Sequence, residues 1–263
     1  MKPAPFKYIA ADSLAAALAA KAAHGSEARF LAGGQSLIPA MNFRLAQPAV
    51  LIDINPVREL DYVRDERSVR IGALTRMRTL ERTALLAEAV RHVAHPQIRN
   101  RGTLGGNLAH ADPASEMPAV MLALGARLRL RSASAERWIE ARDFFVAALT
   151  TALREDEMLV EVELPALPPH TGTAFMEVAR RRGDYAMMGV AAVVTRGKGA
   201  RVALCNAGAT PVLVELVDIE DPAAQVQAKI DPPGSVHASK AFQRHLAGVL
   251  TRRALHLALE RAH

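Results

Sequence analysis

Two glycine-rich segments hold the backbone and side-chain groups best suited to chemistry. The first is Leu31–Leu37, in which Gly33 and Gly34 precede the polar residues Gln35 and Ser36. Glycine lacks a Cβ atom, so the neighbouring backbone N–H groups can approach a phosphate closely. A helix that starts directly after the turn adds free N–H donors and a positive dipole end. The pattern is typical of a phosphate site, but it also occurs in ordinary tight turns.

The second segment, Arg101–Glu116, opens the backbone again at glycines and offers Thr103 and Asn107 as hydrogen-bond donors. Glu116 can accept hydrogen bonds from a sugar hydroxyl, as an acidic residue does in other dinucleotide folds. Because one nucleotide-binding turn would need only one such segment, we predict that the two segments grip one pyrophosphate from opposite sides. Neither is a P-loop or a Rossmann G-x-G-x-x-G, which indicates a dinucleotide held in another fold.

The composition limits which cofactors this chain can hold by itself. Cys205 is the single cysteine, so an intramolecular disulfide is impossible and a reducing, cytoplasmic compartment is expected. One cysteine also cannot hold an iron–sulfur cluster, which needs several thiolates. His92, His95 and His110 lack the spacing of metal ligands, so no metal site is predicted. No signature of nucleophilic catalysis occurs either, and no catalytic residue is predicted.

Charge and hydropathy argue against two other classes of partner. The net charge of +6 is spread along the chain, with no basic stripe interleaved with aromatic residues, so nucleic-acid binding is not predicted. The apolar stretches Leu14–Ala23 and Met187–Thr195 are too short to span a bilayer. The first ten residues lack the long apolar run of a signal peptide.

The apolar pattern divides the chain into three parts. In the first, Asp12 is the expected N-cap of a helix that ends near Gly25. The remaining predicted elements of this small α/β unit are a strand at 28–31, a helix at 36–45 and a strand at 50–54. The second part is α+β, with predicted strands at 60–63, 69–71, 126–130, 137–140 and 158–164 and helices at 79–93 and 113–124.

The third part follows a linker marked by Pro165, Pro168, Pro169 and Gly172. Its predicted elements are strands at 174–178, 188–195 and 202–206 and a long terminal helix at 238–262. No internal repeat of the solenoid type is present.

Four segments, in the order of the chain, resemble the flavin subunits of molybdenum hydroxylases, the group of carbon-monoxide-dehydrogenase medium subunits and xanthine-dehydrogenase flavin domains. Ala32–Leu37 and Gln97–Glu116 are similar to the two FAD-binding signatures of that family. Arg180–Ala186 resembles its R-R-x-G-D-Y/F-A segment, and His237–Leu246 resembles its H-A-S-x-x-Y-R-x-x-L segment. The last match departs from the family at two positions, Phe242 and Gln243.

The resemblance implies an α+β fold in two domains. Residues 1–170 would form an FAD-binding domain of the PCMH (vanillyl-oxidase-like) type, with one α/β lobe at about 1–55 and a second at about 56–170. Residues 174–263 would form a small α+β domain with a three-stranded antiparallel sheet and helices. Only residues 218–229 separate the strand ending near Val217 from Ile230, whereas a longer helical segment is usual there, so this domain is expected to be trimmed.

The resemblance also implies the residues that hold FAD. The two signatures would surround the pyrophosphate, Glu116 would reach the ribose region, and Tyr185 and Leu159 would lie near the isoalloxazine, with His110 as a further flavin contact. The complete predicted set is Ala32, Gly33, Gly34, Gln35, Ser36, Leu37, Thr103, Leu104, Gly105, Gly106, Asn107, His110, Glu116, Leu159 and Tyr185.

The function implied by the resemblance is electron transfer through FAD. A large partner subunit would hold the molybdenum cofactor and oxidise the substrate, and a small partner subunit would hold two [2Fe–2S] clusters, in a heterotrimer or a dimer of heterotrimers. This chain would pass electrons from the nearer cluster to an external acceptor. Two alternatives remain from the sequence: a self-contained flavoprotein oxidase or reductase, and an assembly module without flavin.

Overall fold

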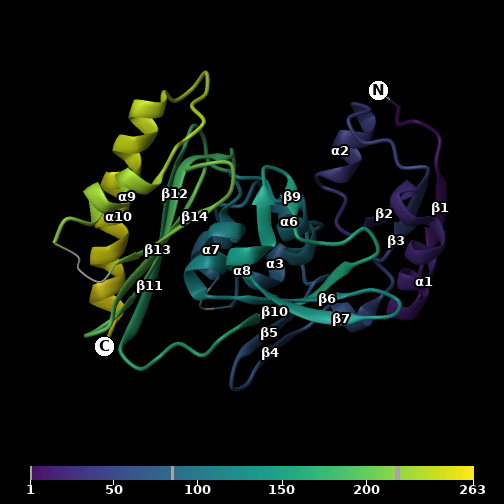
Figure 1. Ribbon diagram of the computed structural model, residues 1–263, viewed down its shortest axis with the longest axis horizontal. Helices are drawn as coiled ribbons and strands as arrows, with labels where there is room; N and C mark the ends of the chain where they lie inside the picture. Colours follow the sequence, from purple (N-terminus) through teal and green to yellow (C-terminus); the bar gives the residue numbers. More distant parts are fainter. Residues whose placement is uncertain (1, 84–85, 217–219) are drawn as a thin grey trace.

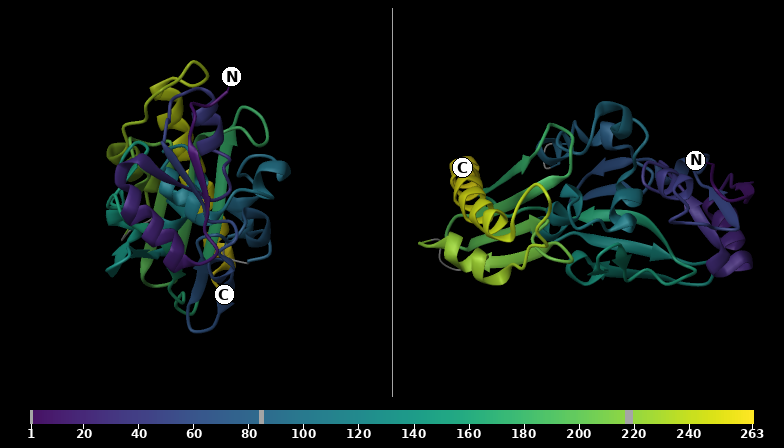
Figure 2. Two further views of the ribbon diagram at one scale, coloured as in Figure 1. Left: turned by 90° about the vertical axis from the view of Figure 1, so that its right-hand side faces the viewer. Right: turned by 90° about the horizontal axis from the view of Figure 1, so that it is seen from above.

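The computed structural model describes residues 2–83, 86–216 and 220–263. Three structural units follow one another along the long axis, an N-terminal lobe, a middle lobe and a C-terminal domain (Figure 1). The two chain ends lie at opposite ends of this axis (Figure 2). The α+β class predicted from the sequence is confirmed.

The N-terminal lobe is a parallel sheet with strand order β1-β3-β2. Its elements are β1 (Lys7–Ala10), α1 (Leu14–His24), β2 (Ala28–Leu31), α2 (Leu37–Asn42) and β3 (Val50–Asp53). Ser13 rather than the predicted Asp12 caps α1, because its Oγ accepts a hydrogen bond from the Ala16 N–H at 3.3 Å. Gly25, at the predicted stop, ends the helix with φ 49°. The parallel pairing places the loop after β2 beside the end of β3.

The middle lobe contains an antiparallel sheet of strand order β4-β5-β10-β6-β7. These strands are β4 (Val63–Asp65), β5 (Val69–Gly72), β6 (Arg127–Arg131), β7 (Glu136–Glu140) and β10 (Met158–Leu164), and a two-stranded ribbon adds β8 (Phe145–Ala147) and β9 (Thr150–Thr151). Its helices are α3 (Met77–Leu80), α4 (Ala87–Val90), α5 (Pro96–Arg99), α6 (Leu104–His110), α7 (Glu116–Leu124) and α8 (Ala141–Phe144).

Two helix predictions in the middle lobe need correction. The helix predicted at 79–93 is wrong: α3 and α4 are separate short helices, and Ala84 and Leu85 lie outside the described residues. The buried side chains of Leu80, Leu86 and Val90 cover the core there, on short helices and a turn rather than on one continuous helix. The helix predicted from 113 begins only at Glu116, since Pro113 and Ala114 form a turn that precedes it.

The C-terminal domain has four antiparallel strands in sequential order rather than the predicted three. They are β11 (Thr171–Ala179), β12 (Ala186–Thr195), β13 (Gly199–Cys205) and β14 (Val212–Leu216), followed by α9 (Pro222–Lys229) and α10 (Lys240–Arg261). The fourth strand satisfies the outer hydrogen-bonding groups of β13, with Val202 opposite Val214. The predicted strand end at Val217, together with Asp218, lies outside the described residues.

The two faces of this sheet belong to different cores. Ala174, Val190 and Val202 face α10 in the core of the C-terminal domain. Phe175, Ala191 and Ala203 point the opposite way and join the core of the middle lobe around α7. Residues 165–170, where the linker is predicted, therefore connect two units that pack closely together.

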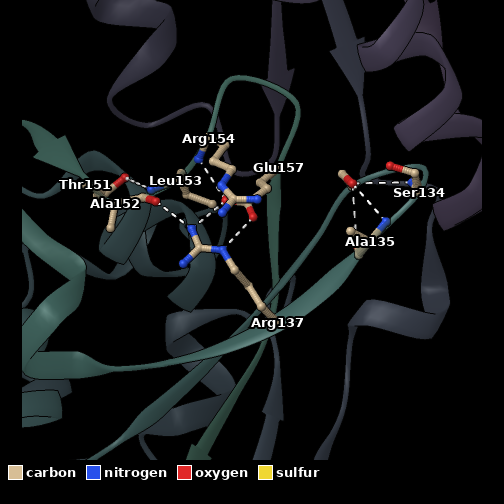
Figure 3. Close-up of polar contacts among 9 residues, drawn as sticks. Ser134, Ala135, Arg137, Thr151, Ala152, Leu153, Arg154 and Glu157 are labelled. Atoms are coloured by element: carbon tan, nitrogen blue, oxygen red, sulfur yellow. Dashed lines mark hydrogen bonds and ion pairs between the residues drawn. The ribbon is translucent and has the colours of Figure 1, made fainter.

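Buried ion pairs fix the loops of the middle lobe. Arg137 on β7 donates two hydrogen bonds to Glu157, of 2.7 Å to Oε1 and 2.8 Å to Oε2 (Figure 3). The Glu157 carboxylate also accepts from the Arg154 N–H at 2.8 Å. Hydrogen bonding by Arg137 holds the pKa of Glu157 below its ordinary value despite burial. Such a bidentate pair is geometrically specific, and it anchors the loop that leads into β10.

Candidate functional site

The two glycine-rich segments, which were predicted to grip one pyrophosphate from opposite sides, lie in direct contact with each other. A Cβ atom added to Gly33 would lie 2.3 Å from the Arg101 carbonyl oxygen and 2.8 Å from the Gly102 Cα. No side chain fits in that space, so glycine at position 33 is what lets the two backbones touch. A Cβ atom on Gly102 would lie 3.9 Å from Gln35 Cγ, and Gln35 Nε2 donates to the Gly33 carbonyl at 2.9 Å.

Two polar side chains that the sequence did not single out tie these segments together. Asn55, two residues beyond the end of β3, donates from Nδ2 to the Ala32 carbonyl at 2.8 Å. Arg76 donates from Nη2 to Asn55 Oδ1 at 2.7 Å and from Nη1 to the Arg101 carbonyl at 2.5 Å. Asn55 and Arg76 thus form a clamp between the segments. The clamp joins residues far apart in the chain, and local sequence patterns do not show such contacts. The one available sign for Asn55 was its place at the end of the strand predicted at 50–54.

An aspartate orients the clamp. Asp53 Oδ1 accepts from the Asn55 backbone N–H at 2.9 Å and from its side chain at 2.6 Å. Burial acts to raise the pKa of Asp53, but hydrogen bonds from Tyr8 and Asn55 outweigh it and leave the pKa below its ordinary value. The carboxylate therefore stays ionised and holds the Asn55 amide in one orientation.

The first segment presents an uninterrupted row of free backbone donors. Among the described residues, no acceptor hydrogen-bonds the N–H groups of positions 33 to 37, and the first bonded N–H is that of Ile38, which donates to the Gly34 carbonyl at 3.0 Å. Gly34 has φ 71°, the left-handed conformation that turns successive N–H groups toward one side. Such a concave row of N–H groups binds anions, and phosphate oxygens above all.

Most backbone N–H groups at the start of α6 in the second segment donate hydrogen bonds to acceptors within the protein. Leu104 N–H donates to the Thr75 carbonyl at 3.0 Å, and Gly105 N–H donates to the Ala73 carbonyl at 2.9 Å. Gly106 N–H donates to Thr103 Oγ1 at 3.1 Å, which makes Thr103 the N-cap of α6. These N–H groups are not offered to a ligand, contrary to the expectation of free donors at a helix start. At the start of α6, within the described part of the chain, the Thr103 N–H is the one that has no acceptor.

The end of the second segment is tightly packed. Asn107 and Ser115 hydrogen-bond each other, with Asn107 Nδ2 2.9 Å from Ser115 Oγ. Glu116, the first residue of α7, is only 4% exposed. Burial, and then the negative charge of Glu177, raise the pKa of Glu116 to about 8. At neutral pH the Glu116 carboxyl can therefore donate a hydrogen bond as well as accept one.

The remaining predicted contacts surround this region. Leu159 is buried in β10 beside a β-bulge. The carbonyl of the next residue, Val160, accepts a hydrogen bond from the Ala73 N–H, and the Ala73 carbonyl accepts one from the Gly105 N–H. His110 ends α6 and is half-buried. Tyr185 precedes β12 and is largely exposed, and partial burial with the nearby charges of Asp112 and Glu116 raises its pKa to about 12.

Other chemistries find no support in the described residues. No group of three or more His, Cys, Asp or Glu residues is arranged to hold a metal ion there. His95 instead packs against Gly183 in the turn before Tyr185. Among residues 2–83, 86–216 and 220–263, no helix combines the length and apolar character needed to cross a membrane.

The chain is similar in sequence to known proteins over its whole length. Residues 4–167 match the family model described as the FAD binding domain in molybdopterin dehydrogenase. The chain is 40% identical over 287 residues to the 6-hydroxypseudooxynicotine dehydrogenase complex subunit alpha of Paenarthrobacter nicotinovorans, covering 100% of this chain and 97% of that protein. It is 36% identical over 285 residues to the carbon monoxide dehydrogenase medium chain of Hydrogenophaga pseudoflava, covering 99% of each.

Solved structures show the same arrangement over the whole chain. A carbon monoxide dehydrogenase from Hydrogenophaga pseudoflava, lacking the Mo-pyranopterin moiety, superposes with a TM-score of 0.94 at 35% identity and covers 100% of both chains. Quinoline 2-oxidoreductase from Pseudomonas putida 86 gives a TM-score of 0.89 at 33% identity and covers 99% of both chains. The coverage of 99–100% shows that the match includes the C-terminal domain. The chain belongs to the family of FAD-binding subunits of molybdenum-containing dehydrogenases.

Proposed function

We propose that the row of N–H groups at positions 33–37 binds the pyrophosphate of FAD. The observation that carries this proposal is the set of unsatisfied backbone donors beside a second backbone that approaches too closely for any side chain. A diphosphate supplies several anionic oxygens in a short span, which suits consecutive N–H donors. The residues present therefore fit the cofactor of the family.

The second segment would shape the site more than it would donate to it. Thr103 N–H remains as one donor, and Gly106 is exposed beside Ala32, since a Cβ there would lie 3.8 Å from the Ala32 Cβ. The hydrogen bonds of Leu104 and Gly105 would keep α6 fixed against the turn that follows β5, while its positive end would face the phosphates. Asn107, locked by Ser115, would line the site without reorienting.

Glu116 and Tyr185 would serve the parts of FAD beyond the pyrophosphate. The Glu116 carboxyl, with its pKa near neutrality, can exchange hydrogen bonds with sugar or ribityl hydroxyls. Tyr185 offers an exposed aromatic face for the isoalloxazine, and its raised pKa keeps the phenol neutral. Contacts of His110 and Leu159 with the ring belong to the same proposal.

The chain would act as the electron-transfer subunit of a larger enzyme in the cytoplasm. FAD supplies chemistry in one- or two-electron units, so it can link one-electron clusters to a two-electron acceptor. The relatives are named as chains or subunits of dehydrogenases, which supports partners here too. A large molybdopterin-binding subunit would oxidise the substrate, and a small [2Fe–2S] subunit would deliver electrons to this chain, which would pass them to an external acceptor.

The test is the visible spectrum and activity of the purified full chain. We expect the two absorbance bands of bound oxidised flavin and release of FAD on denaturation. With a dye acceptor and candidate substrates, the chain alone should show no turnover, and co-expression with the two partner subunits should restore it. A colourless protein would support the assembly-module alternative, and turnover by the chain alone would support a self-contained flavoenzyme.

A further inference from the structure

The C-terminal sheet, along which α10 runs in Figure 1, has a long edge strand, β11. Among the described residues, this nine-residue strand pairs with β12 alone. In an antiparallel pair, alternate residues turn their backbone N–H and carbonyl groups away from the partner strand. The Phe175 N–H donates to Glu88 Oε2 at 2.9 Å. The Thr173 carbonyl accepts from Arg261 Nη1 at 2.8 Å. The odd-numbered residues of β11 are therefore the ones whose backbone groups face outward.

Glu177 is the next outward-facing residue, and both of its backbone groups are open. Among the described residues, neither its N–H nor its carbonyl has a hydrogen-bond partner. Glu177 as a whole is partly exposed although its side chain is only 4% exposed, so the exposed surface of this residue is main chain. Exposed backbone groups on the edge of a sheet are a template for a further strand.

One ion pair already blocks the first half of this edge. Glu88 and Arg261 lie 3.0 Å apart and supply the acceptor for the Phe175 N–H and a donor for the Thr173 carbonyl. Charged side chains are a common way to cover the edge of a sheet. The open stretch of β11 therefore begins at Glu177.

A groove runs beside the edge of β11. Its volume is about 880 Å³, and residues of β11 between Thr171 and Ala179 form one wall. The opposite wall comes from α4 and from Val120, Ala123 and Leu124 of α7. A row of backbone groups facing apolar side chains is the arrangement that binds an extended peptide as an added strand.

Both flanks of the open stretch are basic. On the side of the middle lobe, the groove is lined by Arg91, Arg181 and Arg182. On the other side, Arg252 and Arg253 of α10 surround a smaller hollow together with Met176 of β11. All five arginines are exposed, and within the described residues only Arg181 has a carboxylate partner, Asp184 at 3.9 Å.

The acidic groups of the two hollows do not offset this charge. Glu88 is paired with Arg261, the Glu177 side chain is buried, and Glu260 lies 3.4 Å from His256. A second copy of this chain on the same edge would bring like charges together, which is unfavourable. The charge of the flanks therefore favours an acidic occupant from a different chain.

We propose that an extended, acidic segment of a partner subunit adds to β11 as a further strand at Glu177. The proposal rests on the proposed function, since its occupant comes from the complex proposed there. The segment accepts a hydrogen bond from the Glu177 N–H and donates one to the Glu177 carbonyl. Because successive side chains of a strand point to opposite faces, its carboxylates reach the arginines of the groove on one face and those of α10 on the other.

The first experiment measures hydrogen exchange in the isolated full chain and in the complex co-expressed with both partner subunits. We expect the Glu177 N–H to exchange at least about tenfold more slowly in the complex. The Glu215 N–H is the matched control, because by the same alternation it faces outward on β14, the opposite edge of the sheet. It should exchange equally in both samples. Equal exchange of the Glu177 N–H in chain and complex would overturn the proposal.

The second experiment removes the backbone donor itself. Glu177→Pro deletes an N–H that does not bond to β12, so the β11–β12 ladder is kept. Glu177→Ala loses the same side chain but keeps the N–H. We expect Glu177→Pro to bind the purified pair of partner subunits at least about fivefold more weakly than Glu177→Ala. Glu215→Pro places proline on the opposite edge and should bind like the wild type. Equal affinities of the two Glu177 variants would refute strand addition.

The third experiment leaves the strand intact and tests the charge. Arg91→Glu combined with Arg182→Glu should weaken binding of the partner pair at least about tenfold. Arg64→Glu combined with Arg67→Glu makes the same change in net charge on the β4–β5 hairpin and is the control. An equal loss in both double variants would show that no local acidic segment is bound.

A photo-cross-linker identifies the occupant and separates this proposal from the proposed function. Benzoylphenylalanine at position 182 should cross-link, in the complex, to an acidic segment of a partner subunit, whereas the same group at position 67 should not. Cross-links to a second copy of this chain, or to a segment without acidic residues, would overturn the proposal. If the complex transfers electrons but the Glu177 N–H is unprotected, only strand addition fails. If that N–H is protected but the flavin is not reduced, only the proposed function fails.

Discussion

The two glycine-rich segments touch each other, yet their backbones do different things. The first leaves the N–H groups of positions 33 to 37 without acceptors in the described structure, while the second commits those of Leu104, Gly105 and Gly106 to internal bonds. Their glycines differ accordingly. Gly34 adopts a left-handed conformation that aims donors, whereas Gly105 makes room for Ala73, 2.6 Å from where its Cβ would lie. Similar sequences thus produce one segment that can bind an anion and one that supports it.

The largest effect is expected where the two segments meet. Gly33→Ala would place a methyl group 2.3 Å from the Arg101 carbonyl oxygen and push the segments apart. We expect FAD affinity to fall at least about 100-fold, or ~2.7 kcal/mol. Fluorescence titration of the FAD-free chain with FAD measures it. Gly208→Ala is the control, since its Cβ would be 3.4 Å from the nearest side chain. Tight binding by Gly33→Ala would show that the contact is not needed.

The clamp should matter almost as much. Arg76→Gln loses the hydrogen bonds to Asn55 and the Arg101 carbonyl, and charged hydrogen bonds contribute about 1.5–3 kcal/mol. We expect FAD to bind about tenfold more weakly or worse, by the same titration. Arg78→Gln, on the neighbouring helix turn, removes only an exposed ion pair with Glu81 and should change affinity little. Equal effects of both variants would mean that charge, and not the clamp, is responsible.

A smaller effect separates backbone strain from ligand binding. Gly34→Ala and Gly197→Ala both place alanine at a left-handed position, with φ 71° and 73°, at a cost of about 1–2 kcal/mol in stability. Nothing lies within 4 Å of a Cβ on Gly197. A Cβ on Gly34 would lie 3.1 Å from Ile38 Cγ1 and 3.2 Å from Leu31 Cδ1. Chemical denaturation should therefore show at least as large a loss for Gly34→Ala as for Gly197→Ala, but only Gly34→Ala should weaken FAD binding, by about tenfold. A matched loss of affinity in Gly197→Ala would remove the first segment's special role.

The smallest effect on affinity is expected at the cap of α6. Thr103→Val removes the oxygen that accepts the Gly106 N–H and should lower the free energy of unfolding by about 1 kcal/mol. Thr103→Ser keeps the cap and serves as the control. Because the second segment supports rather than donates, FAD affinity should change by less than roughly threefold, under about 0.7 kcal/mol. A loss as large as that of Gly34→Ala would make the second segment an equal partner in binding.

Local sequence patterns predicted the parts of the fold that depend on neighbours in the chain. Turn chemistry predicts the turn at the glycines before Ser36 and the end of α1 at Gly25. Apolar periodicity predicts the long terminal helix. The patterns did not predict the elements whose formation depends on packing between segments distant in the chain. The stretch 79–93 has helical periodicity but splits into α3 and α4, and a fourth strand at 212–216 pairs with β13. Strand pairing of this kind depends on contacts that periodicity does not encode.

The sequence by itself determined that this chain has two glycine-rich turns, that one cysteine cannot hold a cluster, and that its motifs resemble those of a flavin subunit. Only the tertiary structure decided which N–H groups have acceptors among the described residues, since the acceptors of Leu104 and Gly105 lie in the turn after β5, some thirty residues away in the chain. It also decided that Asn55 and Arg76 form a clamp and that burial raises the pKa of Glu116. Free donors and the raised pKa of a buried carboxyl group are properties of what surrounds a residue, and those surroundings come from segments distant in the chain.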